Sequence, residues 1–227
     1  HLGRDYVIRL IMPDANAPVD LPEVLGPQDK TRPLVVIDAG HGGKDPGASG
    51  SGYVEKSVVL GLALALRDRL VEEGGIRVAV TRDDDTFLIL QDRPEIARRL
   101  DADLFISIHA DSSGEVSAVR GASIYTLSNE ASSEAAALFA ERENSANSLN
   151  GVVTDSKNQE VNDILVELSQ RRVQENSDEF ARLIVREGQG TLRFHPQNRR
   201  SAELAVLRAP DVPAVLYESG FITNPAE

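Results

Sequence analysis

Apolar residues occur in short runs along most of the chain, and these runs alternate between two spacings. Runs rich in β-branched residues predict short strands at 34–38, 76–81, 104–108, 121–126 and 212–218. Between them, apolar residues at helical spacing predict helices at 56–73 and 91–100. Because strand–helix–strand alternation is typical of α/β proteins, we expect a mostly parallel, twisted sheet with helices on both faces.

The first 33 residues lack this alternation. Residues 6–12 predict a short strand, and residues 13–33 contain prolines at positions 13, 18, 22, 27 and 33. Proline at this density excludes a helix or a central strand and predicts a linker or an extended arm. We therefore divide the chain into an N-terminal strand and linker at 1–33 and one larger domain at 34–227.

A second break in the alternation extends over residues 128–190. The Ala- and Glu-rich segment 131–146 and the amphipathic stripe over 160–187 predict helices, and the polar segment 147–159 predicts a loop. We expect this block to be a helical insertion on the α/β core.

The composition limits the partners and the chemistry of the chain. Its 227 residues include 24 Lys and Arg against 36 Asp and Glu, a net charge of −12, so we expect no nucleic-acid partner. The absence of Cys excludes disulfides and Cys-based metal sites. Because the longest apolar runs are far shorter than about 20 residues, we expect no membrane span. No export signal opens the chain at His1.

Four residues with metal or acid–base chemistry lie at the ends of predicted elements. His41 follows the first strand of the domain by three residues, and His109 directly follows the strand at 104–108. Glu218 ends the last strand, and Glu55 begins the helix after the His41 loop. Ligand-binding residues of a parallel sheet gather beyond the carboxyl ends of its strands, so these groups can converge.

Two His and one carboxylate are a frequent zinc ligand set that leaves one position for water, and a second carboxylate can act as general base. The same pattern fits a second interpretation, in which His41 and His109 are buried and bonded to backbone. Glu55 would then be a helix N-terminal acid favoured by the helix dipole. Spacing alone leaves both interpretations open.

The glycine-rich loop at 40–47 raises a different possibility, phosphate binding. The P-loop pattern needs Ser or Thr after Gly-Lys, whereas Gly43-Lys44 is followed by Asp45, whose carboxylate would repel phosphate. We therefore expect these glycines to form a tight turn with positive φ.

Other polar residues have weaker signals. Asp111, two residues after His109, is a candidate extra ligand or an orienting partner of an imidazole, and a turn-capping aspartate fits equally well. Residues 82–85 predict a solvated charged turn, with which Arg93 is expected to pair, and His195 falls in a polar segment that predicts a loop.

Motifs distributed over the domain resemble those of the zinc-dependent N-acetylmuramoyl-L-alanine amidases. In the family's order they are Val36-Ile-Asp-Ala-Gly-His-Gly-Gly-Lys-Asp-Pro-Gly-Ala48, Glu55-Lys56, Thr81-Arg82-Asp83, Leu104-Phe-Ile-Ser-Ile-His-Ala-Asp111 and Val215-Leu-Tyr-Glu-Ser-Gly-Phe-Ile-Thr-Asn-Pro225. The resemblance implies one Zn2+ per chain, bound by His41, Glu55 and His109, with Glu218 as the catalytic glutamate. It also implies hydrolysis of the amide between N-acetylmuramic acid and L-alanine in peptidoglycan. Residues 6–12 resemble the last strand of a wall-targeting domain that often precedes such catalytic domains.

The helical block is similar to that of the periplasmic cell-division amidases of Gram-negative bacteria. In those proteins, the resemblance implies, a helix covers the active site and one of its glutamates occupies the open zinc position. An activator protein with a degenerate peptidase-like domain relieves the block. Glu143 is the first candidate for that glutamate here, followed by Glu141 and Glu134. We expect a periplasmic monomer that acts in cell-wall remodelling and daughter-cell separation.

Two other functions remain open on the sequence. One is a non-catalytic peptidoglycan-binding or regulatory module of the same fold. The other is a zinc carboxypeptidase, which would need a pocket arginine for the terminal carboxylate of its peptide. One segment departs from the family pattern, because Ala202-Glu-Leu204 stands where Ala-Gly-Phe is expected.

Overall fold

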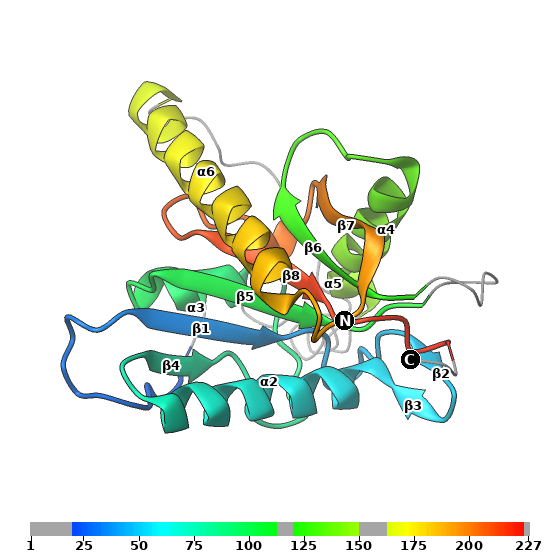
Figure 1. Cartoon of the computed structure of the whole chain (residues 1–227), viewed down its shortest axis with the longest axis horizontal. Helices are drawn as coiled ribbons and strands as arrows, with labels where there is room; N and C mark the ends of the chain where they lie inside the picture. The colour runs from blue at the N-terminus through cyan, green and yellow to red at the C-terminus, as the bar shows by residue number, and fades with distance from the viewer. Residues whose placement is uncertain (1–19, 113–119, 150–162, 225–227) are drawn as a thin grey trace, which may run out of the picture.

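The computed structural model describes residues 20–112, 120–149 and 163–224. Its centre is a six-stranded sheet with the strand order β4-β1-β5-β8-β6-β7 (Figure 1). The strands are β1 (Leu34–Ala39), β4 (Arg77–Val80), β5 (Leu104–His109), β6 (Ala122–Leu127), β7 (Phe194–Ala202) and β8 (Ala214–Glu218). The first four strands of this order are mutually parallel, while β6 runs antiparallel to β8 and parallel to β7. The sheet is therefore mixed and mostly parallel, as predicted.

Helices cover both faces of this sheet, which also confirms the prediction (Figure 1). One face packs against α2 (Glu55–Glu73) and α6 (Asp163–Gly188), whose Val59, Ala63, Ala181 and Val185 share one apolar cluster. The other face packs against α3 (Asp92–Arg99) and α4 (Glu134–Asn144), which is followed by α5 (Ala146–Leu149). A two-stranded hairpin of β2 (Ser49–Gly50) and β3 (Tyr53–Val54) precedes α2, and a 3-10 turn spans Ala205–Leu207.

The central strand β1 shows why the sequence forms this layered fold. All six of its residues are buried, because both sides of a parallel strand face helices. Alternate side chains enter the two opposite clusters, Leu34 and Val36 on the α3–α4 side and Val35 and Ile37 on the α2–α6 side. The next residue on the α3–α4 side is the carboxylate Asp38, so the strand becomes polar as it reaches the functional end of the sheet.

One predicted loop is wrong. The segment with His195, expected to be a polar loop, forms β7 at the edge of the sheet and pairs with β6. Its residues are mostly exposed or half-buried and include Pro196, so no alternation of apolar residues marks the strand. An edge strand tolerates both features, because only one side of its backbone is paired.

The block at 128–190 contains the expected helices, α4 and α6, but they pack differently. The C-terminal half of α6 belongs to the core, with Ala181 and Val185 against the sheet. The helix α4 instead lies on the opposite face, near the ends of β5 and β8. Among the described residues of this block, only those of α4 and α5 reach the candidate site.

The N-terminal segment is described from residue 20 onward, so the predicted strand at 6–12 lies outside the described residues. Leu25 forms an antiparallel bridge with Val78, with N–H···O distances of 2.8 and 3.0 Å. The end of the predicted linker therefore pairs with the edge strand β4. None of the helices in the described part of the chain has the length and hydropathy that crossing a membrane requires.

Candidate metal centre

The predicted ligands converge at the carboxyl ends of β1 and β5. His41 lies just beyond β1, His109 is the last residue of β5, and Glu55 is the first residue of α2. Glu55 Oε1 is 3.1 Å from His41 Nε2 and 3.3 Å from His109 Nδ1. The two imidazole centroids are 4.9 Å apart, and all three residues are buried. Three distant stretches of sequence thus form one compact cluster.

Glycines let the backbone close tightly on these side chains. A Cβ on Gly40 would lie 2.5 Å from His109 Nε2, and one on Gly47 would lie 2.6 Å from Glu55 Oε2. Gly42, Gly43 and Gly47 have φ of 121°, 59° and 65°, as predicted for this turn. The glycines therefore allow the loop backbone to lie close to the side chains of the cluster.

Hydrogen bonds fix the orientation of the ligands. Asp45 Oδ2 lies 3.0 Å from His41 Nδ1, so the other ring nitrogen, Nε2, faces the cluster. Glu55 accepts hydrogen bonds from the backbone N–H groups of Ala48 at 2.7 Å and Ala110 at 2.8 Å. From the sequence, Asp45 was expected only to repel phosphate. Its position four residues after a candidate ligand was the available signal.

The charges of the cluster stabilise one another. Burial lowers the pKa of His41, but the carboxylates of Asp45 and Glu55 outweigh it and raise that pKa to about 9. Burial likewise lowers the pKa of His109, and Glu143 and Glu55 more than reverse the effect. Burial raises the pKa of Glu55, but His109 and His41 hold it well below its usual value. In this arrangement Glu55 is an anion between two nitrogen donors.

The donor set fits a zinc ion. His41 Nε2 and His109 Nδ1 are buried and make no well-directed hydrogen bond within the described residues. One ligand atom from each of His41, Glu55 and His109 lies within 4.8 Å of the others. Two imidazole nitrogens and a carboxylate oxygen are ligands that zinc prefers, and a shared cation would satisfy all three.

A second carboxylate, Glu143 of α4, also faces the imidazoles. Its Oε2 lies 3.1 Å from His109 Nδ1 and 3.7 Å from His41 Nε2, and the residue is 7% exposed. The other two candidates on this helix, Glu141 and Glu134, are exposed. A small cavity that Glu143 and both histidines help to line measures only ≈ 10 Å³, which is about the minimum for one water. α4 and α5 thus contribute Glu143 and Ala146 to the wall of this cavity.

Glu218 stands next to His109, because the β5–β8 register pairs these two residues. Its Oε1 accepts a hydrogen bond from the Asp111 N–H at 2.7 Å, whereas its Oε2 is buried without a partner among the described residues. Burial raises the pKa of Glu218 well above its usual value, and the charges of Asp111 and Glu55 add to this. A carboxyl group with a raised pKa can both accept and return a proton.

In the described residues, the carboxylate of Asp111, which was considered as an extra ligand or an orienting partner of an imidazole, pairs with α4. Its carboxylate forms an ion pair with Arg142 of α4 and accepts from the Ser112 N–H. Its carboxylate makes no hydrogen bond to either imidazole in the described part of the chain. Burial raises the pKa of Asp111 to about 6, although Arg142 opposes this shift. The residue thus connects the site to α4.

Two predictions about arginines are wrong. Arg93 does not pair with the charged turn at 82–85. It is buried and donates to Asp38 Oδ1 at 2.9 Å and to the His41 carbonyl at 2.7 Å. Arg82 is not solvated, because its guanidinium donates to the carbonyls of Ala39 at 2.9 Å and Gly40 at 2.7 Å. Both arginines hold the backbone of the His41 loop, a role that requires tertiary contacts.

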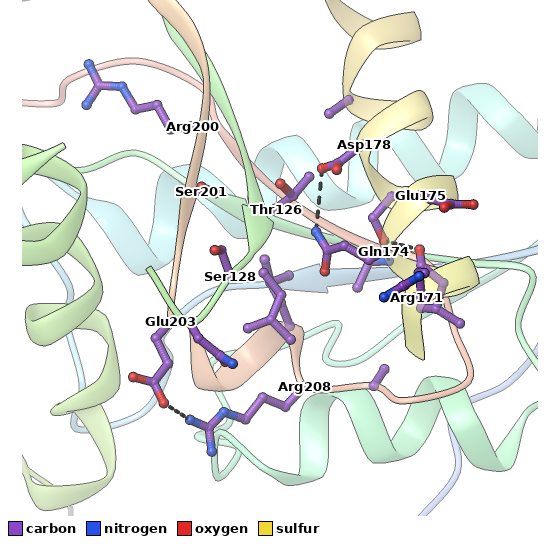
Figure 2. A pocket seen from close by; sticks show the side chains of 18 of the residues that line it. Thr126, Ser128, Arg171, Gln174, Glu175, Asp178, Arg200, Ser201, Glu203 and Arg208 are labelled. Atoms are coloured by element: carbon purple, nitrogen blue, oxygen red, sulfur yellow. Dashed lines mark hydrogen bonds and ion pairs between the residues drawn. The ribbon is translucent and has the colours of Figure 1, made fainter. Parts of the chain in front are cut away.

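A much larger cavity, of ≈ 1120 Å³, lies between α6 and strands β6 and β7 (Figure 2). It reaches Ala214, the first residue of β8, whereas Glu218 is the last. Its lining includes an ion pair of Arg208 with Glu203 and contains none of the three candidate ligands. The metal cluster and the large cavity are therefore separate features at opposite ends of β8.

Comparisons with known proteins agree with the motifs. Residues 35–227 match the family model for N-acetylmuramoyl-L-alanine amidases. Amidase AmiA of Escherichia coli K12 is 41% identical over 196 residues, which cover 86% of this chain and 67% of AmiA. Amidase AmiC of Neisseria meningitidis serogroup B is 39% identical over 198 residues, 86% of this chain and 47% of that protein. The chain thus spans about two thirds of one relative and about half of the other.

Solved structures show the same fold. The amidase AmiC2 of Nostoc punctiforme has a TM-score of 0.57 at 29% identity, covering 85% of this chain and 82% of its own. The catalytic domain of the amidase CwlV from Bacillus (Paenibacillus) polymyxa has a TM-score of 0.55 at 30% identity, covering 86% and 84%. By sequence motifs, family match and fold together, this chain belongs to the N-acetylmuramoyl-L-alanine amidase family.

Proposed function

We propose that this chain is a zinc-dependent hydrolase of the amide bond between N-acetylmuramic acid and L-alanine in peptidoglycan. The observation that carries the proposal is the pair of buried imidazole nitrogens that lie close to Glu55 but make no well-directed hydrogen bond to a described residue, with Glu218 beside them. Membership of the amidase family supplies the substrate class.

His41, Glu55 and His109 would hold the zinc ion, which supplies Lewis-acid activation of the attacking water and of the scissile carbonyl. Glu218 Oε2 has no hydrogen-bond partner among the described residues and would be available to take a proton from water. As the water oxygen bonds to the carbonyl carbon and the C–N bond breaks, Glu218 returns that proton to the leaving nitrogen. The Asp111 N–H, bonded to Oε1, holds the carboxyl in place during both transfers.

We further propose that Glu143 blocks the resting site. Its carboxylate lies next to the ring nitrogens that would bind the metal, where it would take the position that water or substrate needs. Residues on both sides of Glu143 hold α4 on the domain: Arg142 pairs with Asp111, and the Asn144 side chain bonds to Glu203 and Ala205. An activator would have to move α4. We propose that this partner has a degenerate peptidase-like domain and acts in the periplasm during daughter-cell separation.

The decisive experiment incubates the Glu143→Ala chain with purified peptidoglycan sacculi and zinc, and measures new L-alanine amino termini. Glu218→Gln in the same background should lower turnover roughly 10²–10⁴-fold and still bind zinc, because it removes only the general base. Normal turnover by that variant would disprove the role of Glu218.

The same assay separates the other candidate functions. Tight binding to sacculi without release of amino termini would indicate a binding or regulatory module. Release of a carboxyl-terminal amino acid instead would indicate a carboxypeptidase. Appearance of L-alanine amino termini is expected only of the amidase.

A further inference from the structure

Four buried side-chain atoms lack a hydrogen-bond partner within the described residues: His41 Nε2, His109 Nδ1, Glu218 Oε2 and Ser123 Oγ. The proposed function explains the first three. Ser123 is different, because nothing in the proposed metal site or in the acid–base chemistry accounts for its hydroxyl. The residue is only 1% exposed.

The sheet places Ser123 beside the proposed general base. Ser123 of β6 is paired with Glu218 of β8 in the antiparallel register, so the two side chains are cross-strand neighbours on one face. Two residues along β6, Tyr125 lies on this same face and stacks on Phe139 of α4, with ring centroids 4.6 Å apart. Ser123 therefore faces the side of the sheet that α4 and Glu143 cover.

A buried hydroxyl without a partner destabilises the folded protein. The other hydroxyls described near this face are satisfied: Tyr125 accepts from Arg200 at 3.2 Å, and Ser107 donates to Asp38 at 2.7 Å. Alanine would fill the Ser123 position in the strand without that cost. An unpartnered hydroxyl next to an unpartnered carboxyl oxygen indicates a polar group that is present only during the reaction.

We propose that Ser123 is a further catalytic residue, which holds the attacking water together with Glu218. One hydrogen of the water would be transferred to Glu218 Oε2, and the other would be donated to Ser123 Oγ in a hydrogen bond and retained. This hydrogen bond fixes the direction of the water's lone pair toward the carbonyl carbon. The assignment rests on the proposed amidase function.

The test compares two buried serines in the Glu143→Ala background. Ser177 of α6 is 4% exposed, and its hydroxyl donates to the Val173 carbonyl at 2.9 Å and accepts from the Ala214 N–H at 3.0 Å. It is thus a matched serine with two partners, far from the ligands. Release of L-alanine amino termini gives kcat and KM for Ser123→Ala and Ser177→Ala, and thermal unfolding without substrate gives Tm.

Ser123→Ala should lower kcat about tenfold with little change in KM, because one hydrogen bond to the reacting water is lost. Its Tm should equal or exceed that of the background chain, since an unsatisfied hydroxyl is removed. Ser177→Ala should show the opposite pattern, with an unchanged kcat and a Tm lower by roughly 2–6 °C.

Three results would overturn the assignment: an unchanged kcat in Ser123→Ala, a higher KM at constant kcat, or a fall in Tm like that of Ser177→Ala. The last would mean that the hydroxyl has a structural role. Absence of product from the background chain itself would instead refute the amidase function, and the Ser123 assignment with it.

Discussion

Two glutamates approach the same pair of histidines from opposite sides, and the protein holds them very differently. Glu55 starts α2, where the helix dipole favours an anion, and two backbone N–H groups donate to its carboxylate. Glu143 lies in the last turn of α4, where the dipole disfavours an anion. In the described residues no backbone N–H donates to it, and the ion pairs of its carboxylate are those with the two imidazoles.

Under the proposed function, this difference would separate a built-in ligand from a removable one. Glu55 begins α2, which packs against the sheet through the buried residues Val59 and Ala63. Glu143 is instead carried by α4. The interactions that hold this helix include those of the half-exposed Arg142 and the exposed Asn144. Four variants test whether one carboxylate belongs to the metal site and the other to its control.

The largest effect is expected from Glu55→Ala. It removes a ligand and two satisfied hydrogen bonds, so zinc affinity should fall by more than about 100-fold. Competition with a chromophoric chelator measures the dissociation constant. Glu143→Ala is the matched control and should change that constant by less than about tenfold. Equal losses in both variants would show that the two carboxylates are equivalent ligands.

Asp45→Asn tests the orientation of His41 on the Glu55 side. The amide keeps the shape of the carboxylate but no longer favours a proton on His41 Nδ1, so zinc affinity should fall roughly 10–100-fold. The same chelator competition applies, with the exposed Asp68→Asn as control. Parent-like affinity would mean that the loop alone orients the imidazole.

Glu143→Ala tests whether the carboxylate carried by α4 blocks the site. If the carboxylate blocks the site, basal release of L-alanine amino termini from sacculi should rise roughly tenfold. Glu141→Ala is the control, because that glutamate lies on the same helix but is exposed. Parent-like basal rates in alanine variants of Glu143, Glu141 and Glu134 would argue against any carboxylate block by α4.

The smallest effect is expected from Arg142→Ala. Its ion pair with Asp111 has one half-exposed partner, so its loss should weaken the attachment of α4 only modestly. Basal activity should rise roughly 2–5-fold, and zinc affinity should stay constant. Arg186→Ala, which removes an exposed ion pair on α6, should leave basal activity unchanged. A rise as large as that of Glu143→Ala would make the ion pair the main attachment.

The order of strands and helices along the chain, and the positions of the candidate site residues at their ends, were predictable because their signals are local. Buried strands are continuous apolar runs, and His109 and Glu218 stand at the ends of such runs. The position of Glu143 also has a local signal. Ala136, Phe139, Ala140 and Glu143 follow the helical spacing of one buried face, which excludes Glu141 and Glu134.

Contacts between residues far apart in sequence determined the features that the sequence did not predict. The strand β7 carries no apolar pattern, and pairing with β6 alone makes it a strand. Arg82 and Arg93 are buried charged residues. Hydrogen bonds to carbonyls and a carboxylate far away in sequence offset the cost of their desolvation. Ser123 became a candidate only because the register sets it beside Glu218.

The sequence by itself determined the family, the alternation of elements and the residue types able to bind a metal, since these depend on neighbouring residues and on motifs. The tertiary structure decided which carboxylate is fixed to the sheet, which is carried by α4, and which buried polar atoms lack partners. Those properties depend on strand order, register and helix packing, which join segments as distant as Ser123 and Glu218.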